Sequence, residues 1–147
     1  MLVIGLGNPD RGDDAAGILV ARGLAAYGVK AVESPGGMLD LLEIWANNDK
    51  VVAVDAVYSN AAPGTIYVWD AQAAPLPCHV FRSSTHSFGL ADAIELARAL
   101  DRLPNSLTVF GIEAAQFAVG TPPSSPVLLA VSSLIEQIAS RAKNFSS

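Results

Sequence analysis

Two acids and one histidine, far apart along the chain, have side-chain types that can bind a divalent metal ion. Asp14 follows a short apolar strand and a glycine-rich loop, and Asp55 closes the hydrophobic run Val51–Val54. His86 occurs in the segment SSTHSFG, before a predicted helix. Two carboxylates and an imidazole suit a borderline ion such as zinc or nickel, with further positions open for water or substrate. The pattern therefore favours a cation over a phosphate.

Each of these residues also has an ordinary structural interpretation. Asp13 and Asp14 at a helix start can cap the helix or interact with its dipole. Asp55 at a strand end can accept structural hydrogen bonds, and His86 can be an exposed or capping residue. Because a helix N-terminus disfavours a cation, Asp14 can be a ligand only if its carboxylate points away from the helix amides, with Asp13 as the cap. The residues alone leave both interpretations open.

The elements that must position these residues alternate between strands and helices. Strands are expected at 2–6, 29–33, 50–57, 65–69 and 107–112, and helices at 13–27, 38–45, 90–100 and 125–142. This order predicts a single domain, residues 1–147, with a three-layer α/β/α sandwich around a mostly parallel five-stranded sheet. The strand at 65–69 follows a short turn, so we expect it to run antiparallel. In such a sheet Asp14, Asp55 and His86 fall at one edge, where open α/β sheets bind ligands.

Bulk composition narrows the classes of function. The net charge is −5 and the nine basic residues are scattered, which argues against a nucleic-acid partner, since a duplex-binding surface needs clustered Lys and Arg. No apolar run approaches the roughly 20 residues that cross a bilayer, and no secretory signal is expected. The single cysteine, Cys78, excludes an internal disulfide and fits a reducing cytosol. We therefore expect a cytoplasmic protein without a membrane partner.

Four segments resemble motifs of the nickel-iron hydrogenase maturation endopeptidases. GLGNPDRGDDAAG resembles their G-x-G-N and D-[DE]-x-x-G signature, and VVAVDAV followed by PGTI resembles their aspartate-bearing strand and Pro-Gly turn. THSFGLADAIELA resembles their histidine segment, and GIEAAQFAVGTPPSSPV resembles their G-I-E-P and S-P-x-V block. Ala114 and Pro123 replace the proline and leucine usual in that last block. The segments occur in the family's order and span nearly the whole chain.

The resemblance implies a cytosolic endopeptidase that removes the C-terminal peptide of a nickel-iron hydrogenase large-subunit precursor after nickel insertion. The precursor is then the expected partner, and it supplies the nickel. By position, the family's nickel ligands and catalytic residues fall on Asp14, Asp55 and His86. Residues expected near the substrate groove are Asn8, Asp13, Gly36 and Gly37, together with the loop from Ala71 to Thr85. Asp13 is expected to orient the helix start, and Asn8 to hold the loop or contact the substrate backbone.

Two other functions are alternatives. Peptidyl-tRNA hydrolases also open with a strand and G-L-G-N-P-G, but that family continues with T-R-H-N and is basic. This chain instead has Arg11-Gly12-Asp13-Asp14 and is acidic. A metal-binding chaperone that holds the immature large subunit without cutting it would retain the same three candidate ligands. Cleavage of the precursor separates the endopeptidase from both alternatives.

Overall fold

A five-stranded sheet forms the middle layer of the protein. The structure is a computed structural model that describes residues 1–35, 37–81 and 89–145. The strands are β1 (Leu2–Leu6), β2 (Ala31–Ser34), β3 (Lys50–Val57), β4 (Ile66–Asp70) and β5 (Ser106–Glu113). They lie in the order β2-β1-β3-β5-β4, with β4 antiparallel to β5 and the other pairs parallel. The predicted mixed sheet is confirmed.

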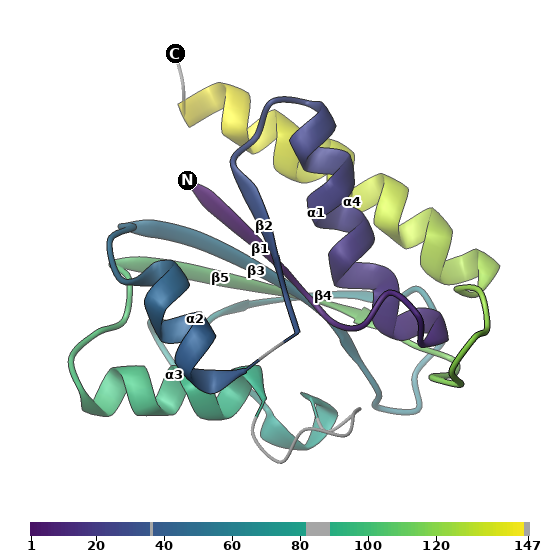
Figure 1. Cartoon of the computed structure of the whole chain (residues 1–147), viewed down its shortest axis with the longest axis horizontal. Coiled ribbons are helices and arrows are strands. Elements are labelled where there is room, and N and C mark those ends of the chain that lie inside the picture. Colours follow the sequence, from purple (N-terminus) through teal and green to yellow (C-terminus); the bar gives the residue numbers. More distant parts are fainter. Residues whose placement is uncertain (36, 82–88, 146–147) are drawn as a thin grey trace.

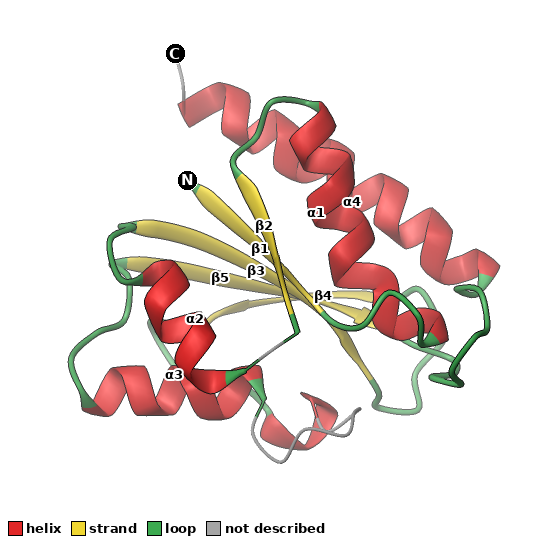
Figure 2. Ribbon diagram, viewed as in Figure 1, coloured by secondary structure: helices red, strands yellow, loops and turns green. Residues whose placement is uncertain are grey.

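Helices cover both faces of the sheet (Figures 1 and 2). One face carries α1 (Ala16–Ala26), which a 3-10 turn η1 (Gly12–Ala15) precedes, and α4 (Ser125–Phe145). The other face carries α2 (Met38–Trp45), α3 (Leu90–Ala99) and the 3-10 turn η2 (Cys78–Phe81). Buried apolar side chains form one cluster on each face, with Val20, Leu24 and Leu134 in the first and Leu41, Trp45 and Ile94 in the second. The result is the expected three-layer sandwich.

The sequence predicted the bounds of the central strand β3 and the direction of the edge strand β4, but not the partner of β4. β3 has the predicted bounds, because its β-branched run is buried between two helical layers. β4 runs antiparallel as expected, but β3, which precedes it in the chain, is not its partner. The chain leaves β4 through η2 and α3, and β5 then inserts between β3 and β4. The edge position of β4 therefore depends on a long connection, not on the short turn before it.

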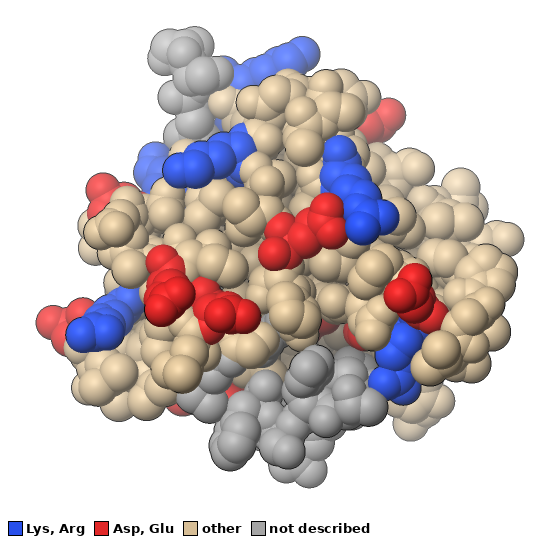
Figure 3. Space-filling model, viewed as in Figure 1, with Lys and Arg blue, Asp and Glu red and all other residues tan. Residues whose placement is uncertain are grey.

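Charged residues of both signs are interspersed on the face shown in Figure 3. One exposed pair, Arg22 and Glu33, joins α1 to β2 with a distance of 3.1 Å between guanidinium and carboxylate. Exposed pairs of this kind contribute little to stability. Within the described part of the chain, no helix is long and apolar enough to span a bilayer.

Candidate active site

Asp14 and Asp55 lie at the carboxyl ends of two neighbouring strands, β1 and β3. The chain connections that follow these two strands lead to opposite sides of the sheet. The chain leaves β1 through α1 on one face of the sheet, and it reaches β5 from β4 through α3 on the other. Open α/β sheets bind ligands at such a switch point, beyond the carboxyl ends of the strands. Asp55 lies near that end of β3, and Asp14 follows the loop after β1. The two acids are close enough for the charge of Asp14 to act on Asp55.

Two glycines let the segment that carries Asp14 approach the sheet closely. A Cβ at Gly7 would lie 1.9 Å from the carbonyl oxygen of Asp14, and Gly7 has a positive φ of 136°. A Cβ at Gly17 would lie 2.3 Å from the carbonyl oxygen of Val54 and 2.4 Å from that of Leu6. Real Cβ atoms do not tolerate such distances. The glycines of the opening motif therefore bring the helix start next to the end of β3.

The carboxylate of Asp14 turns back toward the loop that precedes it. Its Oδ2 accepts a hydrogen bond of 3.0 Å from the backbone N–H of Asn8, and only 4% of Asp14 is exposed. The Oδ1 of Asn8 in turn accepts a bond of 2.8 Å from the N–H of Asp10. A contact with the preceding loop meets one condition for a ligand role of Asp14, whereas the other condition, a helix cap from Asp13, is not met. Asn8 holds the loop, while its side chain stays exposed at the same edge of the sheet.

Asp55 is partly buried, and its carboxyl group has an unusual proton affinity. The pKa of Asp55 is raised to about 8, first by burial and second by the negative charge of Asp14. A hydrogen bond of 2.8 Å from the Ala56 N–H to Oδ1 opposes this increase. Strongly perturbed pKa values at the edge of a sheet are typical of functional sites. The acid pair is therefore the best candidate for chemistry in the described structure.

Asp13 does not cap its own helix. Its side chain is fully buried and binds the segment after β5. We call the hydrogen bonds between the Asp13 carboxylate and this segment the Asp13 clamp. The carboxylate accepts bonds from the N–H groups of Ala115 (2.7 Å), Gln116 (3.2 Å) and Ser124 (2.6 Å), and from the Ser124 hydroxyl (2.8 Å). The cap expected from its sequence position is wrong, because these donors 102 to 111 residues away satisfy the carboxylate instead. The buried side chain lines no surface.

Glu113 is a third buried acid, and the side-chain types alone did not indicate it. Its Oε2 accepts a bond of 2.8 Å from the Ser59 N–H, and its Oε1 accepts bonds from the hydroxyls of Ser59 and Tyr67. These contacts tie the end of β5 to the turn after β3 and to β4. The only signal in the sequence was the GIE motif within the family resemblance.

Two of the predicted site residues, His86 and Gly36, lie outside the described residues. The chain before His86 reaches the same edge of the sheet, because the N–H of Tyr58 donates to the carbonyl of Val80 at 3.0 Å. Gly37 lies at the start of α2 with extended backbone angles that any residue can adopt. Among the described residues, no group of three His, Cys, Asp or Glu side chains could hold a metal ion. The described site therefore holds two of the three predicted ligands.

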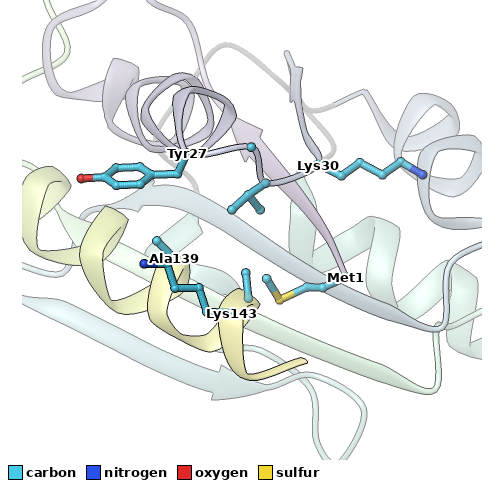
Figure 4. A pocket seen from close by; sticks show the side chains of 8 residues that line it. Met1, Tyr27, Lys30, Ala139 and Lys143 are labelled. Carbon is cyan, nitrogen blue, oxygen red and sulfur yellow. The ribbon is translucent and has the colours of Figure 1, made fainter. Parts of the chain in front are cut away.

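A cavity of about 280 Å³ lies at the opposite end of the sheet, where the parallel strands begin. We call this end the amino edge, and the end where the parallel strands finish the carboxyl edge. Its lining includes the residues labelled in Figure 4, which are Met1, Tyr27, Lys30, Ala139 and Lys143. None of the predicted site residues lines this cavity. It contributes nothing to the acid pair.

The fold and the acid pair define an α/β protein with an acidic candidate site at the switch point of its sheet. A sequence model of the HycI hydrogenase maturation proteases matches residues 26–141. The chain belongs to the hydrogenase maturation protease family and is a peptide hydrolase. This membership decides against the peptidyl-tRNA hydrolase alternative.

Individual proteins and solved structures are similar to this chain over most of its length. The chain is 28% identical over 131 residues to Protein FrxA of Pyrococcus furiosus, covering 88% of this chain and 95% of that protein. The [NiFe] hydrogenase maturation protease HybD from Thermococcus kodakarensis superposes with a TM-score of 0.76 at 26% identity, covering 96% and 97% of the two chains. The hydrogenase maturating endopeptidase HybD from E. coli superposes with a TM-score of 0.75, covering 97% and 91%. Its identity is 24%, so this last likeness shows the fold alone.

Proposed function

We propose that the protein is a cytoplasmic endopeptidase that removes the C-terminal peptide of a nickel-iron hydrogenase large-subunit precursor. Family membership supports the reaction class, and the names of similar structures support the hydrogenase precursor as substrate. The observation that carries the site assignment is the close approach of the helix start that follows Asp14 to the end of β3, which carries Asp55. Because both described site residues are aspartates, we assign the activity to the aspartic type.

The nickel ion belongs to the substrate in this proposal, since the precursor receives it before cleavage. Asp14, Asp55 and His86 are the residues proposed to contact it. The two carboxylates alone favour a harder ion, so the imidazole of His86 is needed to complete a donor set suited to nickel. Such an ion, when bound, polarises a carbonyl group and acidifies a water molecule.

The surrounding residues hold and orient the two acids. The backbone N–H of Asn8 donates to the Oδ2 of Asp14, and we propose that the exposed side-chain amide of Asn8 contacts the substrate backbone. Gly37 precedes the first residue of α2 and is proposed to lie near the substrate. Asp13 holds the loop after β5 against the loop that carries Asp14. Together these contacts keep the acid pair in place before the precursor arrives, which favours productive positioning.

Cleavage of nickel-loaded precursor tests the proposal. The variants are Asp14→Asn, Asp55→Asn and His86→Ala, and the readout is the mass of the precursor's C-terminus. Each variant should lose at least about 100-fold in rate, because each removes a group that contacts the reacting centre. Asp101→Asn is the matched control, since Asp101 is exposed and its positive φ of 55° suits asparagine.

Full activity in all three variants would overturn the site assignment. An unchanged C-terminus after incubation with the wild-type protein would favour the chaperone alternative, in which the protein holds the precursor without cutting it.

A further inference from the structure

Three segments bring an arginine and two aromatic rings together beside the acid pair. Tyr58 follows β3, three residues after Asp55, and Phe117 lies in the loop after β5. Their ring centroids are 6.1 Å apart, with an interplanar angle of 66°. The Nε–H of Arg11, from the loop before η1, donates to the carbonyl of Phe117 at 3.3 Å. We call Arg11, Tyr58 and Phe117 the aromatic patch.

The aromatic patch is fixed to the same loop that carries Asp14. The N–H of Gly12 donates to Thr121 at 3.1 Å, and the N–H of Gly120 donates to Asp10 at 2.7 Å. The Asp13 clamp adds four further bonds between the two loops. The patch therefore keeps a constant position relative to the acid pair, as a binding surface next to a reacting centre must.

The patch offers both apolar and donor groups, with Tyr58 exposed and Arg11 and Phe117 partly buried. Tyr58 is 47% exposed, although its ring is large and largely apolar. Among the contacts of the described residues, Arg11 uses only its Nε–H, which leaves the other guanidinium N–H groups for a ligand. Tyr and Arg are the residues that most often dominate binding at protein interfaces. Single exposed apolar residues are common on protein surfaces, and Leu39, for example, carries no such implication.

The charged and polar groups around the aromatic patch favour a polypeptide as its ligand. The charged carboxylate of Asp14 lies next to the patch, so a phosphate or nucleic acid would meet negative charge there. A peptide backbone is neutral, supplies carbonyl acceptors for Arg11, and carries side chains that can rest on an aromatic ring.

We propose that the aromatic patch binds the substrate polypeptide beside the scissile bond. An apolar side chain of the substrate packs on Tyr58 and Phe117, and a substrate carbonyl accepts from Arg11. This inference rests on the proposed function, because it names the surface by which the same site recognises its substrate.

Kinetics with nickel-loaded precursor test the patch. Tyr58→Ala and Phe117→Ala should raise KM by about tenfold and change kcat much less, as removal of an aromatic anchor predicts. Arg11→Lys, which keeps the charge but loses the planar fork, should also raise KM. The control is Tyr27→Ala: Tyr27 is 62% exposed but lies at the amino edge. Circular dichroism and thermal melts confirm that each variant is folded.

The outcomes separate this inference from the proposed function. A wild-type KM in folded Tyr58→Ala and Phe117→Ala overturns the patch and leaves the endopeptidase intact. Failure of the wild-type protein to cleave overturns the endopeptidase. In that case the affinity of the same variants for nickel-loaded precursor, measured by surface plasmon resonance, decides the patch: weaker binding supports it and unchanged binding overturns it.

Discussion

The carboxyl group of Asp55 should make the stability of the metal-free protein depend on pH. Its pKa is about 8 in the folded state against an ordinary value of 3.8, so between these values the folded chain keeps a proton that the unfolded chain has lost. The free energy of unfolding should therefore fall as pH rises through this window, by up to about 1.4 kcal/mol per pH unit. Asp55→Asn should remove this slope and be more stable than the wild type at about pH 8.

Urea denaturation from about pH 5 to about pH 8.5 in the presence of a chelator measures this slope. The Asp101→Asn variant should follow the wild type throughout. Parallel curves for wild type and Asp55→Asn would show that the buried carboxyl group does not carry the pH dependence.

Asp13 should matter for stability more than any exposed acid of the same loop. Asp13→Ala leaves three backbone N–H groups and a hydroxyl without their acceptor, inside the protein. We expect a loss of about 3 kcal/mol in the free energy of unfolding. Asp10→Ala, at an exposed position in the same loop, should change it by less than about 0.5 kcal/mol. Equal losses in the two variants, measured by urea denaturation, would contradict the clamp.

These residues also show what the sequence could reveal about the site. Asp14 and Asp55 could be placed together because each follows a recognisable strand, and parallel strands end at one edge. Asp13 could not be assigned, since an acid in the first turn of a helix has the same local signature whether it caps the helix or binds elsewhere. Its partners Ala115 and Ser124 lie in a segment without periodicity, and only folding brings them near.

At the scale of elements, α1 depends on its contact with the sheet at Gly17. A methyl group there would clash with the carbonyl oxygens of Leu6 and Val54, which belong to the rigid strands β1 and β3. Gly17→Ala should therefore cost about 3 kcal/mol in the free energy of unfolding and lower kcat, because the displaced helix start moves Asp14.

Gly23→Ala on the same helix is the matched control for this prediction. The three atoms nearest to the added methyl group all belong to the Ile135 side chain, with Cδ1 at 2.3 Å and Cγ1 at 3.0 Å, and none is a backbone atom. A side chain can shift where a strand carbonyl cannot, and alanine favours a helix by about 1 kcal/mol over glycine. We expect a change of less than about 1 kcal/mol and normal cleavage. A Gly23→Ala loss as large as that of Gly17→Ala, in thermal and urea melts, would show that close helix–sheet contact at Gly17 has no special role.

The bounds of an element could be predicted where its hydrophobic residues in sequence are the ones buried in the structure. β3 is buried on both faces, so its β-branched run marked both ends. The predicted helix at 13–27 instead divides into η1 and α1, because Asp13 and Asp14 serve contacts outside the helix. The pairing of β4 with β5 could not be predicted from the sequence. It depends on the path of the long connection through α3, which brings β5 between β3 and β4.

At the scale of the whole molecule, the candidate site and the cavity lie at opposite ends of the parallel strands. The carboxyl edge carries the acid pair, the aromatic patch and the Asp13 clamp, while the amino edge carries the cavity near Tyr27 and Lys143. The expected groove loop at 71–85 starts at the amino edge, because the N–H of Ala71 donates to Leu107 at the start of β5. The acid pair, Asn8 and the aromatic patch lie at the carboxyl edge, so bound precursor should slow hydrogen exchange there and not around the cavity. We expect nickel-loaded precursor to protect peptides covering 8–14, 55–60 and 115–121, and to leave 27–31 and 139–143 unchanged. Protection confined to the amino edge, measured by mass spectrometry, would place the substrate on the wrong side of the sheet for both proposals.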